Sequence, residues 1–80
     1  MPDVVLYSRP GCHLCEDALQ LLESLRTEFG FALREVNIEF DAELERRYFV
    51  EIPVIEMGGD VIAQAPIDAA VLRRAIANSS

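Results

Sequence analysis

Apolar residues follow both strand-like and helix-like spacing along the chain, which predicts a mixed α/β fold. A continuous apolar run at 4–7 is typical of a buried strand, and the Pro-Gly segment at 8–11 ends it. The segment after this break carries apolar residues at helical spacing, on one stripe that ends at Gly30. The stripe consists of Leu14, Ala18, Leu21, Leu22, Leu25 and Phe29. We therefore expect the first strand to lead directly into a long helix that packs these six residues in the core.

The remainder of the chain predicts three more strands and two more helices. The strands are expected at 31–38, 52–57 and 61–63, with a tight turn at 58–60. Asp41 can cap a short helix. Asp68 can cap a final helix at roughly 67–77, with Pro66 as an alternative first-turn residue. The resulting order, β-α-β-α-β-β-α, predicts one domain over residues 1–80, with a four-stranded mixed sheet and helices on both of its faces.

Charge and composition narrow the classes of function. The 80 residues have a formal net charge of -7, with 14 acidic residues and 7 basic residues, all of them arginine. Such a chain repels phosphate backbones and anionic lipid surfaces, so we expect neither a nucleic-acid nor a membrane partner. The N-terminus resembles no signal peptide, and no apolar run reaches the ~18 residues of a membrane span. We expect a cytoplasmic monomer, in a compartment where a close pair of cysteines is more often catalytic or metal-binding than structural.

Cys12 and Cys15 are the only cysteines, and their spacing permits three interpretations: a redox pair, half of a metal site, or two buried apolar residues. One helical turn separates them, which places their Cα atoms within the ~4.4–6.8 Å that a disulfide requires. Cys12 is expected at a helix N-terminus, where unpaired N–H groups and the helix dipole favour a thiolate, and Cys15 one turn deeper. Dithiol exchange needs this asymmetry, so we assign Cys12 as the nucleophile and Cys15 as the resolving thiol.

The charged neighbours of Cys12 are expected to act on its pKa in opposite directions. His13 and Arg9 favour the thiolate, whereas Glu16 and Asp17 oppose ionisation. The same residues do not complete a metal site, because a tetrahedral site needs four ligands and the chain offers two thiols and one imidazole. We therefore predict no metal site within the chain. A zinc or iron–sulfur site completed by another molecule, and a redox-inactive interaction domain, remain the alternatives.

Three segments of the chain resemble glutaredoxins and glutaredoxin-like redoxins of the thioredoxin superfamily. LYSRPGCHLC at 6–15 is similar to their active-site segment, VNIEFDAELERRYFVEIPVI at 36–55 to their second strand, second helix and proline-led third strand, and GGDVIAQAPID at 58–68 to their hairpin and final-helix entry. The resemblance implies a thioredoxin-like fold of the glutaredoxin type, with sheet order 2-1-3-4. It also implies a cis Ile52–Pro53 bond beside the dithiol, although X–Pro bonds are usually trans.

The resemblance further implies a thiol–disulfide oxidoreductase that reduces protein or glutathione mixed disulfides and needs no tightly bound cofactor. Its substrate-binding residues would be Arg9, for a carboxylate, and Ile52 and Pro53, whose backbone an extended peptide or glutathione could pair with. The family's Cys-Pro-Tyr-Cys is Cys-His-Leu-Cys here, and AQAPID at 63–68 replaces its Gly-Gly pair, which leaves Asp68 to stand in for an acidic glutathione contact. Glutathione is thus a possible co-substrate, and glutathione or a thioredoxin-reductase-type enzyme the expected electron donor.

Overall fold

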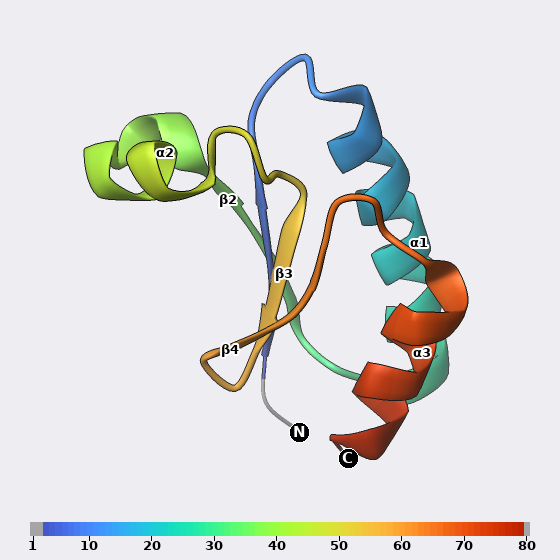
Figure 1. Ribbon diagram of the computed structural model, residues 1–80. Helices are drawn as coiled ribbons and strands as arrows, with labels where there is room; N and C mark the ends of the chain where they lie inside the picture. Colours follow the sequence, from blue (N-terminus) through green and yellow to red (C-terminus); the bar gives the residue numbers. More distant parts are fainter. Residues whose placement is uncertain (1–2, 80) are drawn as a thin grey trace.

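The computed structural model describes residues 3–79, and its elements follow the predicted order (Figure 1). In chain order they are β1 (Val4–Ser8), α1 (His13–Phe29), β2 (Leu33–Asn37), the 3-10 helix η1 (Ile38–Phe40), α2 (Ala42–Tyr48), β3 (Val54–Met57), β4 (Asp60–Gln64) and α3 (Ala69–Asn78). The predicted boundaries differ from these by a residue or two, and η1 was not predicted. Residues 1, 2 and 80 of the predicted domain lie outside the described residues.

The four strands form one mixed sheet in the order β2-β1-β3-β4, as the resemblance implied. β1 pairs in parallel with β2, from Val4 opposite Leu33 to Ser8 opposite Asn37, and antiparallel with β3. β3 and β4 form an antiparallel hairpin. The central position of β1 accounts for its continuous apolar sequence, because a strand with neighbours on both edges and layers on both faces meets little water.

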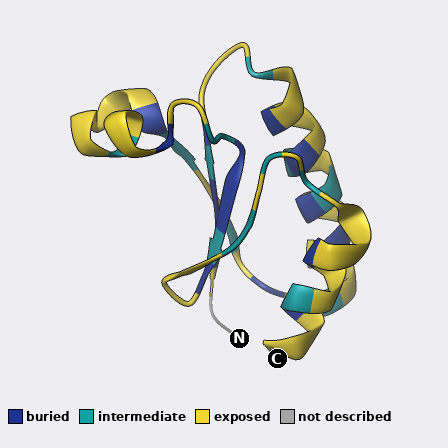
Figure 2. Cartoon of the chain, in the orientation of Figure 1, coloured by how far each residue is buried: buried dark blue, intermediate teal, exposed yellow. Residues whose placement is uncertain are grey.

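Helices cover the two faces of the sheet unequally. α1 and α3 lie on one face, and α2 lies near one end of the other (Figure 1). The main core fills the space between the sheet and the α1–α3 layer, and the inward sides of these helices are buried (Figure 2). It consists of Val4, Leu6, Ala18, Leu22, Leu25, Phe31, Ile55, Met57, Leu72 and Ile76.

The predicted core stripe of α1 is wrong at its first residue. Leu14 is 58% exposed, whereas Ala18, Leu22 and Leu25 are buried and Leu21 is partly buried. Leu14 and Leu21 lie on one edge of the stripe, away from the line through the buried residues. Leu14 is also in the first turn, so it extends toward solvent at the end of the helix.

A smaller cluster joins α2 to the opposite face of the sheet. Ile38, Tyr48 and Val54 are buried together there. The hydroxyl groups of Tyr7 and Tyr48 donate to the two carboxylate oxygens of Glu56, at 3.0 and 3.3 Å, and their ring centroids are 5.1 Å apart. Burial, and then the adjacent Glu56 carboxylate, raise the pKa of both tyrosines above the ordinary value. These contacts hold the end of α2 against β1 and β3.

The ends of the helices have the predicted caps. α1 is closed by Gly30, whose φ of 79° lies in the left-handed region that glycine adopts without strain. Asp41 and Asp68 cap α2 and α3, and Asp68 Oδ1 accepts from the backbone N–H groups of Ala70 and Val71 at 2.9 and 3.1 Å. Within residues 3–79, none of the helices combines the length and the apolar character that crossing a membrane requires.

Candidate redox site

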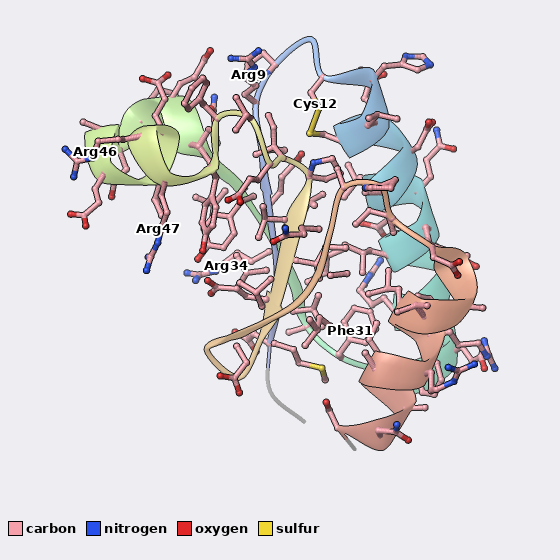
Figure 3. All side chains as sticks on the ribbon, in the orientation of Figure 1. Arg9, Cys12, Phe31, Arg34, Arg46 and Arg47 are labelled. Atoms are coloured by element: carbon pink, nitrogen blue, oxygen red, sulfur yellow. A yellow bond between two sulfur atoms is a disulfide. The ribbon has the colours of Figure 1, made fainter. Side chains whose placement is uncertain are left out.

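A tight turn between β1 and α1 carries the first cysteine to the start of the helix. The backbone N–H of Cys12 donates to the carbonyl of Arg9 at 3.4 Å, with Pro10 and Gly11 between them. Gly11 has a φ of 79°, and Pro-Gly at the two central positions is the pattern of a type II turn. The turn places Cys12 beyond the end of β1, at the N-terminus of α1 (Figure 3).

Cys12 and Cys15 are joined by a disulfide, with their Cα atoms 5.2 Å apart. Cys12 lies at the helix N-terminus, as expected from the sequence, and its backbone is extended because it is the N-cap of α1. Its Sγ accepts a hydrogen bond from the backbone N–H of Cys15 at 3.2 Å. The N-cap geometry therefore brings the two side chains together and directs a helix N–H group at the outer sulfur.

The two cysteines differ in exposure, in the sense expected of a nucleophile and a resolving thiol. Cys15 is 2% exposed and packs in the first turn of α1, whereas Cys12 is partly exposed at the loop. Cys12 is therefore the cysteine of the pair that is more open to a reactant from solvent. The chemical roles themselves stay predictions.

A cavity of about 400 Å³ opens beside the disulfide on the side of β2. Its lining includes both cysteines, together with Ser8 and Glu35. Ser8, the one polar residue buried among residues 3–79, donates from its hydroxyl to Glu35 Oε2 at 2.8 Å. Neither residue was predicted from the sequence. A signal existed, because Glu35 shares a face of β2 with Leu33, which packs against the main core.

Arg9 is exposed and lines both this cavity and a neighbouring cavity of about 340 Å³. Ala42, Glu45, Arg46 and Phe49 line the rest of that neighbour. Figure 3 shows Arg9 on the loop beside Cys12 and Arg46 on α2. The predicted carboxylate contact at Arg9 therefore has a second guanidinium group nearby, although substrate binding by Arg9 stays a prediction.

His13 and Glu16 lie on the outer surface of the first turn of α1. Their side chains are 88% and 68% exposed, and His13 Nδ1 is 3.7 Å from Glu16 Oε2. Glu16 also lines the cavity of the two cysteines. The structure thus places both residues near Cys12, and their predicted influence on its ionisation stays a prediction. Among residues 3–79, no three His, Cys, Asp or Glu side chains gather as metal ligands would.

The peptide bond between Ile52 and Pro53 is cis, as the resemblance implied, and so is Ala65–Pro66, which was not predicted. Tyr7 pairs with Val54, so the antiparallel register places Pro53 beside Ser8, at the start of the Cys12 loop. The backbone N–H of Ile52 donates to the carbonyl of Tyr48 at 3.0 Å. A substrate strand that used this N–H group would have to displace the end of α2.

Pro53 lines a third cavity, of about 200 Å³, between the first turns of α1 and the β4–α3 loop. Asp68 lines none of these three cavities, although it was predicted to contact substrate. Its side chain instead caps α3, and a substrate contact by Asp68 stays a prediction.

A protein-family comparison agrees with this geometry, because the model of the glutaredoxin-like domain (DUF836) matches residues 3–77. The chain belongs to the glutaredoxin-like domain family. Solved structures of at least two proteins share more than 30% identity with this glutaredoxin-like chain. The X-ray structure of target protein XcR50 from X. campestris is 35% identical, with a TM-score of 0.78 over 96% of this chain and 97% of that one.

Protein Ne2328 from Nitrosomonas europaea, solved by NMR, is 31% identical, with a TM-score of 0.77 over 90% of this chain and 88% of that one. Thioredoxin 1 from Thermosipho africanus is 10% identical with a TM-score of 0.72, over 96% of this chain and 92% of that one. At that identity the likeness shows the fold alone, which is thioredoxin-like. No curated protein sequence matches this glutaredoxin-like chain significantly.

Proposed function

We propose that the protein is a dithiol oxidoreductase that reduces disulfides through Cys12 and Cys15. The observation that carries the proposal is the disulfide itself, which joins a partly exposed N-cap cysteine to a buried cysteine one turn away. The disulfide is the oxidised form of the pair. In the reduced form, the partly exposed Cys12 would attack the substrate disulfide. The family assignment and the thioredoxin-like fold support the same chemistry.

The catalytic cycle balances without a bound cofactor. In the reduced protein, the Cys12 thiolate attacks one sulfur of the substrate disulfide, whose S–S bond breaks and releases the first substrate thiolate. Cys15 then loses its proton and attacks Cys12 Sγ, which breaks the mixed disulfide and releases the second substrate thiolate. The two thiolates take up two protons, and the Cys12–Cys15 bond re-forms. A donor dithiol, or two donor thiols, supplies two electrons to reset the pair.

The N-terminus of α1 supports the first step. The Cys15 N–H group that lies 3.2 Å from Cys12 Sγ forms a stronger hydrogen bond with a thiolate than with a neutral sulfur. The helix dipole adds to this stabilisation, because it places partial positive charge at the same end. Both contributions favour the ionised form of Cys12, the form that reacts with disulfides.

Two single variants test the assignment of roles. Cys12→Ser should abolish the reduction of a protein disulfide, and Cys15→Ser should accumulate a covalent substrate adduct at Cys12, seen by mass spectrometry under non-reducing conditions. Full activity in both variants would refute the proposal. If zinc or iron were instead found with the purified reduced protein and were lost from both variants, the metal-binding alternative would be favoured.

The electron donor is tested by two coupled assays run side by side. One supplies glutathione, glutathione reductase and NADPH, and the other supplies thioredoxin reductase and NADPH, with the same disulfide substrate. We propose a cytosolic setting, in which both donors keep thiols reduced. NADPH consumption that depends on Cys12 identifies the donor, and the absence of turnover with both donors would contradict an enzymatic role.

A further inference from the structure

The third cavity is apolar, and it lies next to the disulfide without including it. Apolar side chains make up all but one of its eight lining residues, which are Leu14, Asp17, Ala18, Leu21, Pro53, Ala65, Pro66 and Ile67. Leu14, between the two cysteines in the sequence, leaves 58% of its surface exposed here. An open apolar hollow beside a reactive group favours a ligand that presents an apolar side chain.

The distance from Cys12 to this cavity suits a substrate that is a polypeptide. Leu14 is two residues after Cys12, so their Cα atoms are at most roughly 7 Å apart. On the other wall, Pro53 lies beside Ser8, at the start of the Cys12 loop. A chain whose cysteine is bonded to Cys12 thus reaches the cavity with a side chain one or two residues away.

Charge sets a second requirement on the substrate. Asp17 is the only charged residue in the lining, and the neighbouring cavity beyond the disulfide contains Glu16 and Glu35 against one basic residue, Arg9. The chain as a whole has a net charge of -7. An acidic segment would be repelled as it approaches, whereas a neutral or basic segment would be attracted.

We propose that the third cavity selects protein disulfides in which an apolar residue flanks the attacked cysteine and no acidic residue is near it. Glutathione has no apolar side chain and carries net negative charge, so it uses neither feature. The inference rests on the proposed dithiol function and adds its substrate class. Placing one apolar side chain in a half-open pocket should favour such a substrate about tenfold over one with a polar residue at that position.

The test compares two disulfide-linked peptides that differ only beside the cysteine, with leucine on both sides in one and serine on both sides in the other. Stopped-flow mixing with the pre-reduced protein gives the second-order rate constant for each peptide. We expect the leucine peptide to react about tenfold faster. Leu14→Ser should bring this ratio close to one, and Val71→Ser should preserve it. Val71 is a suitable control because it is 50% exposed on α3 and is not part of the cavity lining.

A third peptide keeps both leucines and carries glutamate two positions from the cysteine, next to one of the leucines. It should react more slowly than the leucine peptide, and Asp17→Asn should narrow that difference at low salt, where surface charges are least screened. Equal rates for the leucine and serine peptides, with both reduced, would overturn the inference and leave the dithiol function intact. If neither the peptides nor a small neutral disulfide were reduced, the proposed function itself would be overturned.

Discussion

Asp68 offers a test that separates a structural role from a substrate-binding role at one side chain. Its Oδ1 accepts from the N–H groups of Ala70 and Val71 at 2.9 and 3.1 Å, so Asp68→Ala leaves both groups without this partner. Both lie at an exposed helix end where water can replace the carboxylate, which places the expected loss near the middle of the usual range for N-caps, at about 1 kcal/mol. For a domain of this size the melting temperature should fall by roughly 4–8 °C.

Asp68→Asn is the matched variant, because its side-chain carbonyl preserves the acceptor and only the charge is lost. The lost charge near the helix dipole should cost about 0.5 kcal/mol. Asp17→Ala controls for the change in net charge, since Asp17 is exposed within α1 and caps no helix. Urea unfolding followed by circular dichroism gives all three values.

A capping role for Asp68 would be ruled out if Asp68→Asn lost as much stability as Asp68→Ala, or if Asp68→Ala lost less than about 0.3 kcal/mol. The same variants address the substrate contact that the family resemblance implied. If Asp68 binds glutathione, Asp68→Asn should raise KM for a glutathionylated substrate while it largely preserves stability. A capping role alone would leave KM unchanged.

Three further predictions concern stability. Tyr7 and Tyr48 hold their protons more tightly in the folded state, so their contribution to the free energy of unfolding should be full below pH 10 and should fall as the pH rises through their raised pKa values. Tyr48→Phe should weaken this fall, measured by urea unfolding at pH 8 and 11. An equal loss of stability between these two pH values in both proteins would contradict the prediction. Leu22→Ala should lower the free energy of unfolding by about 2–5 kcal/mol because Leu22 is fully buried, whereas Leu14→Ala should change it by no more than about 0.5 kcal/mol. Comparable losses in the two variants would show that the burial is misassigned. Gly30→Ala should lower the stability measured by thermal unfolding by about 1 kcal/mol through backbone strain alone, because an added Cβ meets nothing within 4 Å. Gly30→Asn should cost less. No loss of stability in Gly30→Ala would argue against the left-handed cap.

Local sequence predicted most of the secondary structure because burial imposes a period on each element. The continuous apolar run of β1 reflects a strand with layers on both faces, and the stripe of α1 reflects a single buried face. Leu14 shows the limit of this reasoning. Helical spacing assigns a residue to a face, but only the tertiary structure shows how far along the helix that face stays covered.

The site was predictable where its parts are adjacent in the sequence. Cys12 and Cys15 are three residues apart, so local geometry alone brings their side chains together. The contact between Ser8 and Glu35 joins residues 27 apart and depends on the register of β1 against β2, which no local pattern specifies. The third cavity likewise needs the β4–α3 loop to pass beside α1. The sheet order and the cis bond at Pro53 were expected from family resemblance, and not from residue preferences.

In the proposed cycle, the side chain that caps α1 also carries the atom that reacts. Aspartate or serine caps a helix with an oxygen whose chemistry is constant, whereas the capping Cys12 Sγ would change partner and charge in each round of the proposed cycle. While this sulfur is an anion, the first turn should be held most firmly, and while it is shared with a bulky substrate, the same turn should loosen. The hydrogen-exchange rate of the Cys15 backbone N–H would then differ between the oxidised pair, the reduced pair and the mixed disulfide.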